Sequence, residues 1–135
     1  MTDQAQAVFD ENVLAVLATV NDDGSPWAVP VHVATDGVYV YWFSHETAVH
    51  SQNITRDSRV SLSLFSPDES KGPKGVYVNG RAEPIAGEQS EVAREIFVKR
   101  IGTLPPVFAT SHAYRLPLGQ FSEEKSTGNC WYFYS

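Results

Sequence analysis

The stretch VLAVLATVNDDGSPWAVPVHVATDGVYVYWF, residues 13–43, decides the fold. Residues 13–20 are a β-branched apolar run that ends in Asn21-Asp22-Asp23-Gly24, which is the pattern of a strand followed by a tight turn. Two more strands, separated by the hairpin pair Asp36-Gly37, are predicted at residues 26–34 and 38–43. The three runs together indicate an antiparallel meander.

The remainder of the chain predicts four more strands and two or three helices. Residues 59–65 alternate valine and leucine with serine, which is the period of a strand with one buried face. Further strands are expected at residues 75–85, 113–121 and 130–134. Helices are expected at residues 3–11, directly after Ser44, and at residues 88–101, where Gly102 ends the last helix. We therefore expect a mainly β fold, an antiparallel split β-barrel of six to seven strands with two or three short helices.

Composition and charge narrow the class of protein. A chain of 135 residues, 42% of them apolar, is long enough for one hydrophobic core, so we expect a single domain over residues 1–135. The net charge of −6 disfavours a nucleic-acid partner, and every Lys and Arg lies at or after Arg56. No apolar segment is long enough to span a membrane, and the N-terminal sequence lacks the pattern of a signal peptide. With Cys130 as the single cysteine, the cytoplasm is the expected compartment.

The turn after the third strand is the best candidate for a phosphate site. Ser44 is positioned to cap the helix, and Thr47, His50 and Ser51 follow at spacings that place them on one helical face. The free backbone N–H groups of a helix N-terminus, together with hydroxyl groups and an imidazole, suit a dianion. The alternative is that Ser44 and Thr47 only cap the helix and that His50 is a solvated surface residue.

The order of these segments resembles the pyridoxamine 5'-phosphate oxidase-like family of FMN-binding split β-barrels. The resemblance covers residues 12–66 closely and continues through residues 75–83. It implies a homodimer that holds FMN at the subunit interface. It also implies that Pro30, Val31 and His32 run alongside the isoalloxazine ring, while Ser44, Thr47, His50 and Ser51 lie at the FMN phosphate.

The chain departs from the family pattern at two positions of the phosphate site. The oxidases place an Arg early in the second strand and a Lys in the helix, where this chain has Val29 and His50. Losing one charge-assisted hydrogen bond costs about 1.5–3 kcal/mol, so we expect FMN to be weakly bound or absent. The arginines that could replace the missing charge are Arg56, Arg59, Arg81 and Arg100, and each is more simply a surface residue. The last residues, 130–135, lack the basic groups with which the oxidases hold the substrate phosphate, which argues against a vitamin B6 substrate.

Three functions remain open at this point. The first is an FMN-binding protein, an oxidoreductase of unknown substrate in which the flavin supplies the chemistry. The second is a non-catalytic binding protein for flavin, haem or another planar ligand on the same barrel, and the third is a ligand-free interaction module. No catalytic residue is assigned. The spacing of the four histidines matches no compact zinc site, so no metal is expected.

Overall fold

The computed structural model describes residues 3–66, 74–102, 112–119, 121–122 and 130–134, the last two segments by their backbone. Ten strands of these segments form two sheets, with orders β2-β1-β5-β6-β10-β9 and β3-β4-β8-β7. Every pair is antiparallel except β9 and β10. The strands are β1 (Leu14–Val20), β2 (Pro26–His32), β3 (Ala34–Thr35), β4 (Tyr39–Ser44), β5 (Arg59–Phe65), β6 (Lys74–Arg81), β7 (Glu83–Ile85), β8 (His112–Pro117), β9 (Phe121–Ser122) and β10 (Cys130–Tyr134). The helices are α1 (Asp3–Glu11), α2 (Val49–Arg56) and α3 (Glu88–Ile101).

The first hairpin has the form that its sequence predicts. Strands β1 and β2 pair along their whole length, from Leu14 opposite His32 to Val20 opposite Pro26. Gly24 in the connecting turn has φ 85°, in the left-handed region where a glycine is favoured. The turn is closed by the amide of Asn21, which donates to the carbonyl of Ser25 at 2.8 Å.

Two predicted strands are each divided, because the chain crosses from one sheet to the other. The strand expected at 26–34 breaks at Val33, whose amide donates to the carbonyl of Val13 at 2.8 Å. The strand expected at 75–85 breaks at Ala82, whose amide donates to the carbonyl of Ser58 at 2.8 Å. The strand expected at 113–121 ends at Pro117. These expectations were wrong about continuity, because the hydrogen-bond partner changes at each break and the alternation of buried side chains is interrupted there, as with Val33 and Ala34, which are both buried.

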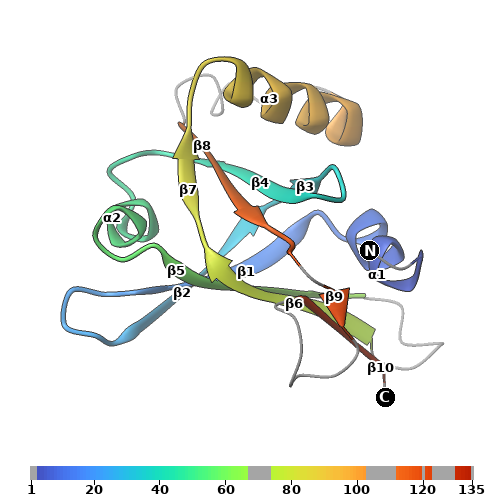
Figure 1. Cartoon of the computed structure of the whole chain (residues 1–135), viewed down its shortest axis with the longest axis horizontal. Helices are drawn as coiled ribbons and strands as arrows, with labels where there is room; N and C mark the ends of the chain where they lie inside the picture. The colour runs from blue at the N-terminus through green and yellow to red at the C-terminus, as the bar shows by residue number, and fades with distance from the viewer. Residues whose placement is uncertain (1–2, 67–73, 103–111, 120, 123–129, 135) are drawn as a thin grey trace.

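The main core lies between the two sheets. The alternation in β5 is confirmed, with Val60, Leu62 and Leu64 buried. Trp42 of the small sheet is fully buried and stacks on Tyr114, with ring centroids 6.1 Å apart. Helices α1 and α2 lie at opposite sides of the sheets (Figure 1). Among the described segments, no helix is long and apolar enough to cross a membrane.

Helix α3 covers the small sheet from outside. Figure 1 shows the helix above β3, β4, β7 and β8, with the six-stranded sheet below them. Phe97 and Ala93 are fully buried. The ring of Phe97 packs edge-on against the ring of Phe43, with centroids 5.1 Å apart. The helix ends at Gly102, whose φ of 93° confirms the predicted stop.

Candidate functional site

The turn between β4 and α2 brings two of the predicted site residues into contact. His50 Nε2 lies 2.7 Å from Ser44 Oγ. However, Ser44 does not cap the helix as predicted, because a turn in which the amide of Ala48 donates to the carbonyl of His45 intervenes. The N-cap of α2 is Ala48, which is extended and offers no side-chain cap. The first amides of α2 are therefore open to a ligand that accepts hydrogen bonds.

Thr47 and Ser51 have different environments. Thr47 is exposed and precedes the helix, so the predicted helical spacing from Thr47 to His50 does not apply. Ser51 lies in the first turn of α2 and is only 1% exposed, and its Oγ has no hydrogen-bond partner within the described part of the chain. Leaving a buried hydroxyl unpaired costs about 1–3 kcal/mol. Its Oγ is covered by protein atoms, so a ligand oxygen would reach this hydroxyl only after a shift of the first turn of α2.

Partial burial favours the neutral form of the His50 imidazole. Desolvation lowers the pKa of its imidazole below the usual value. A second histidine lies nearby, since His112 is paired in register with Ser44 and its Nε2 lies 3.5 Å from a carboxylate oxygen of Glu46. The turn thus carries imidazoles where a phosphate site more often has permanent cations.

Two residues hold α2 in place: Asn53, which sequence reasoning did not select, and Arg56, which it considered only as a replacement cation. Asn53 is buried, and its amide donates to Thr19 Oγ1 at 3.0 Å and to Asn21 Oδ1 at 2.9 Å. Arg56 donates to the carbonyl of Val20 at 2.6 Å and to Asn53 Oδ1 at 3.0 Å. These bonds fix α2 to the end of the β1–β2 hairpin. The i, i+3 spacing of an amide and a guanidinium was their only signal in the sequence.

The three residues predicted beside the isoalloxazine ring lie on the edge strand β2. Pro30 and His32 are exposed, whereas Val31 points inward and is 7% exposed. A proline within a strand is typical of a sheet edge, and β2 is an edge strand of the six-stranded sheet. Pro30 pairs with Val16 and borders an apolar hollow of about 360 Å³. The hollow is lined by Asn12, Leu14, Ala15, Val16, Pro30, Ser63, Leu64 and Phe65.

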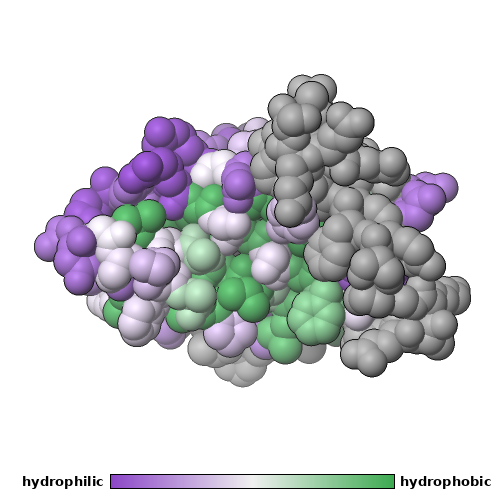
Figure 2. Space-filling model, turned by 90° about the horizontal axis from the view of Figure 1, so that it is seen from below, coloured by the Kyte–Doolittle hydropathy of each residue, from purple (hydrophilic) through white to green (hydrophobic). Residues whose placement is uncertain are grey.

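This hollow belongs to the outer face of the six-stranded sheet. Figure 2 shows apolar residues gathered in the middle of the face seen from below. Leu14 and Val16 are each 45% exposed, and Phe65 is 63% exposed. Large apolar side chains grouped on one face are typical of a binding or subunit surface.

The predicted site residues therefore fall on two neighbouring elements. Ser44, His50 and Ser51 surround the first turn of α2, while Pro30, Val31 and His32 follow β2, against which α2 also packs. The described residues hold no group of three His, Cys, Asp or Glu side chains that could bind a metal ion.

Comparisons with known proteins add a family and a fold. The family model for pyridoxamine 5'-phosphate oxidase matches residues 1–117. No curated protein matches the chain in sequence. Among solved structures, a heme binding protein from Mycobacterium smegmatis superposes with a TM-score of 0.73 and 21% identity over 84% of this chain, which spans 49% of that protein.

Two further structures have the same fold. A FAD-binding protein from Mesorhizobium loti gives a TM-score of 0.66 at 23% identity, over 85% of this chain and 88% of that one. An F420 reductase gives a TM-score of 0.68 at 19% identity, over 87% of this chain and 94% of the reductase. Identities this low establish likeness of fold alone.

Proposed function

Because the chain belongs to the pyridoxamine 5'-phosphate oxidase family, we propose that it is an FMN-binding protein, a flavin-dependent oxidoreductase built on an antiparallel split β-barrel. One observation carries the proposal: helix α2 begins without a side-chain cap, and the Ser44–His50 pair lies at its first turn. A phosphate accepts hydrogen bonds from such an N-terminus. The FAD-binding protein and the F420 reductase with this fold add support.

Different side chains bind the phosphate and the ring of the cofactor. Ser44 and Ser51 offer hydroxyl groups and His50 an imidazole to the phosphate, and the exposed Thr47 adds a hydroxyl at the rim. The backbone of the edge strand at residues 30–32 runs along the flavin ring. A bound flavin supplies hydride or electron transfer, while the protein positions it. The donor set fits a phosphate, but with neutral His50 as its basic group we expect modest affinity.

The proposed assembly is a homodimer with a flavin site at each end of the subunit interface. The exposed apolar side chains Leu14, Val16 and Phe65 on the outer face of the large sheet support it. A second copy of the same face would bury them in an isologous contact. Such burial also supplies the water-excluded wall that a flavin ring at the sheet edge needs.

The test is the visible spectrum of the purified chain, followed by titration with FMN and with riboflavin. We expect flavin bands, or binding of added FMN near one per subunit. FMN should bind at least about tenfold more tightly than riboflavin, because only FMN carries the phosphate. A colourless protein that binds no added FMN overturns the proposal. Equal affinity for the two flavins would show that the phosphate does not bind at the α2 turn.

A second candidate is haem binding without catalysis. The exposed His32 lies opposite Leu14, next to the apolar hollow of the outer face. An imidazole beside apolar walls is the environment in which haem iron is held. Titration with haemin should then give a shifted Soret band that is lost in His32→Ala and kept in His112→Ala. An unshifted band in the parent protein excludes this candidate.

A further inference from the structure

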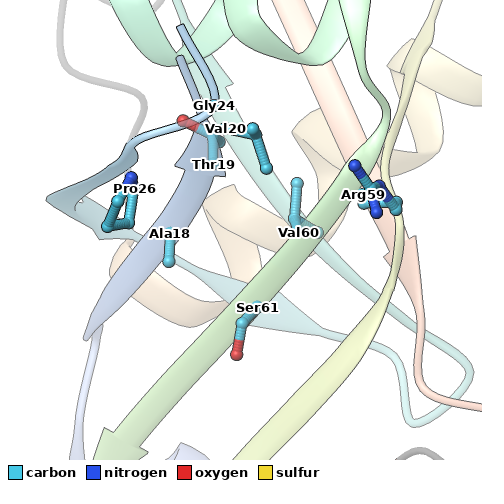
Figure 3. A pocket seen from close by; sticks show the side chains of 8 residues that line it. All are labelled: Ala18, Thr19, Val20, Gly24, Pro26, Arg59, Val60 and Ser61. Atoms are coloured by element: carbon cyan, nitrogen blue, oxygen red, sulfur yellow. The ribbon is translucent and has the colours of Figure 1, made fainter.

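A second hollow lies on the outer face of the large sheet, at the end where β1 meets the start of β5. It is a shallow, open hollow of about 430 Å³, a volume within the range of small-molecule sites. Figure 3 shows Gly24 and Pro26 at one side, Arg59 at the other, and Ala18 and Ser61 between them. Pro26 and Ala18 contribute apolar surface. Arg59, the one cationic residue among the described lining residues, lies at one edge.

That cationic edge carries a second guanidinium. Arg59 on β5 and Arg81 on β6 are directly opposite in register, and both are exposed. Like charges in this position repel one another and destabilise a sheet. Asp57 offsets only part of the repulsion, because it is one carboxylate beside two guanidinium groups.

The hydrogen bonds of the pair leave donors open. Arg59 donates two hydrogen bonds to the Asp57 carboxylate, from Nε to Oδ1 at 3.0 Å and from Nη2 to Oδ2 at 2.7 Å. The hydrogen bonds from Arg59 are the main cause that lowers the pKa of Asp57 to about 2, and the charge of Arg81 adds to it. Arg81 donates from Nη1 to Ser58 Oγ at 3.1 Å and has no ion-pair partner among the described residues. The cluster therefore keeps a formal charge of about +1 and unused N–H groups on both arginines.

Two other acidic residues, Asp22 and Asp23, lie in the turn that follows β1. Asp22 lies 3.5 Å from Arg56, and Asp23 accepts the hydroxyl of Ser25 at 2.5 Å and its amide at 2.9 Å. Asp23 keeps its charge, but neither aspartate forms an ion pair with Arg81 of β6, which β5 separates from β1.

We propose that this hollow binds a small organic oxyanion, with its phosphate or carboxylate on Arg59 and Arg81 and its planar or apolar body against Ala18, Val20 and Pro26. The guanidinium fork matches both oxyanions in geometry. An anion there relieves the repulsion between the two arginines, which water alone only screens. Arg56 ends α2 and Arg59 begins β5, so the site lies near the opposite end of α2 from Ser51. It is therefore separate from the proposed flavin phosphate site.

The experiment is an NMR titration of the ¹⁵N-labelled full chain at constant ionic strength, without added flavin. The probes are phenyl phosphate and benzoate, with inorganic phosphate and phenol as single-feature controls. Phenyl phosphate or benzoate should saturate with the largest amide shifts at Ala18, Ser61 and Arg81. The better of the two identifies the oxyanion, and each control should bind at least about tenfold more weakly.

Variants separate this site from surface charge and from the flavin site. Arg81→Gln should weaken the better probe at least about tenfold, since it removes one charge-assisted contact. Arg81→Lys should recover part of the loss, and Lys99→Gln, which removes one charge from exposed α3, should change nothing. FMN binding should be the same in Arg81→Gln and the parent. Shifts confined to His50 and Ser51, equal affinity of Arg81→Gln and the parent, or no saturation overturns this site without touching the flavin proposal.

Discussion

The outer faces of the two sheets differ in what covers them. On the small sheet α3, the longest helix of the described chain, buries Phe97 and Ala93 completely against Phe43. On the large sheet, Val16 and Phe65 keep 45% and 63% of their surface exposed, and the face holds two hollows. Burial of apolar area stabilises both the fold and an association. The apolar outer face of the small sheet is buried within the fold, whereas that of the large sheet stays exposed, which is the basis for proposing a ligand or a second subunit there.

The largest effect should come from removing the side chain that seals the small sheet. Phe97→Ala creates a cavity at a fully buried position and should lower the free energy of unfolding by about 3–5 kcal/mol, measured by chemical denaturation. Phe65→Ala is the matched change on the open face, and at protein concentrations too low for association it should cost less than about 0.5 kcal/mol. Similar losses for the two variants would mean that the faces do not differ in this way.

A charge on the open face should break the proposed dimer. Val16→Glu leaves the monomer folded because the side chain already has 45% of its surface exposed. In the dimer it would bury a carboxylate and should weaken association by at least about 2 kcal/mol, or about thirtyfold. Sedimentation velocity measures the change. Val98→Glu, at an exposed position of α3, is the control, and this variant should remain dimeric. A parent protein that is monomeric at micromolar concentration contradicts the proposed assembly.

Local patterns in the sequence were enough to predict most of the strands. The alternation of Val60 and Leu62 with serine identified a half-buried strand, and Gly102 marked the end of α3. The breaks at Val33 and Ala82 could not be predicted, because both residues stay buried and continue the alternation of the residues before them. Their hydrogen-bond partners change at these residues, and a partner distant in sequence leaves no local trace.

The site was predicted by residue type and missed in its local geometry. Serine is a favoured N-cap residue, but Ser44 does not cap α2. The helix begins only at Val49 because the intervening residues form a separate turn. The contact from Ser44 to His50 closes over that turn. The burial of Ser51 depends on how α2 packs against β1, and the face of a short helix does not specify that packing.

The polar turn should respond to pH where the apolar face does not. Burial lowers the pKa of His50 in the free protein, whereas a phosphate dianion favours the charged imidazole and raises it. FMN binding therefore takes up a proton, and affinity should increase as the pH falls from 8 towards 6, until protonation of the phosphate limits the gain. His50→Ala should weaken FMN by about 1–3 kcal/mol near pH 6 and flatten the profile, and His50→Lys should tighten binding near neutral pH. Fluorescence titration at each pH is the measurement, and an alanine variant that follows the parent profile removes His50 from the site.

Without flavin the same histidine should act on stability with the opposite sign. A lowered pKa in the folded state means that the unfolded chain binds more protons. The contribution of neutral His50 is thus fully present above its unfolded pKa of about 6.5 and is lost as the pH falls through the folded value. His50→Gln should make the free energy of unfolding less sensitive to acid between pH 7 and 5. An unchanged slope would show that burial does not control this group.

The smallest effect should come from the unpaired hydroxyl of Ser51. In the ligand-free protein, Ser51→Ala removes a buried donor that has no partner, so the free energy of unfolding should stay the same or rise by up to about 1 kcal/mol. With FMN bound, the same change removes a contact to the phosphate and should weaken affinity by about 0.5–1.5 kcal/mol. Ser90→Ala in α3 is the control and should change FMN affinity in neither direction. Denaturation with and without FMN measures both quantities, because a bound ligand raises the free energy of unfolding by RT ln(1 + c/Kd), where c is the concentration of free ligand. Opposite signs in the two conditions are expected only if the hydroxyl faces a ligand, whereas a loss of stability without FMN would mean that Ser51 already has a structural partner.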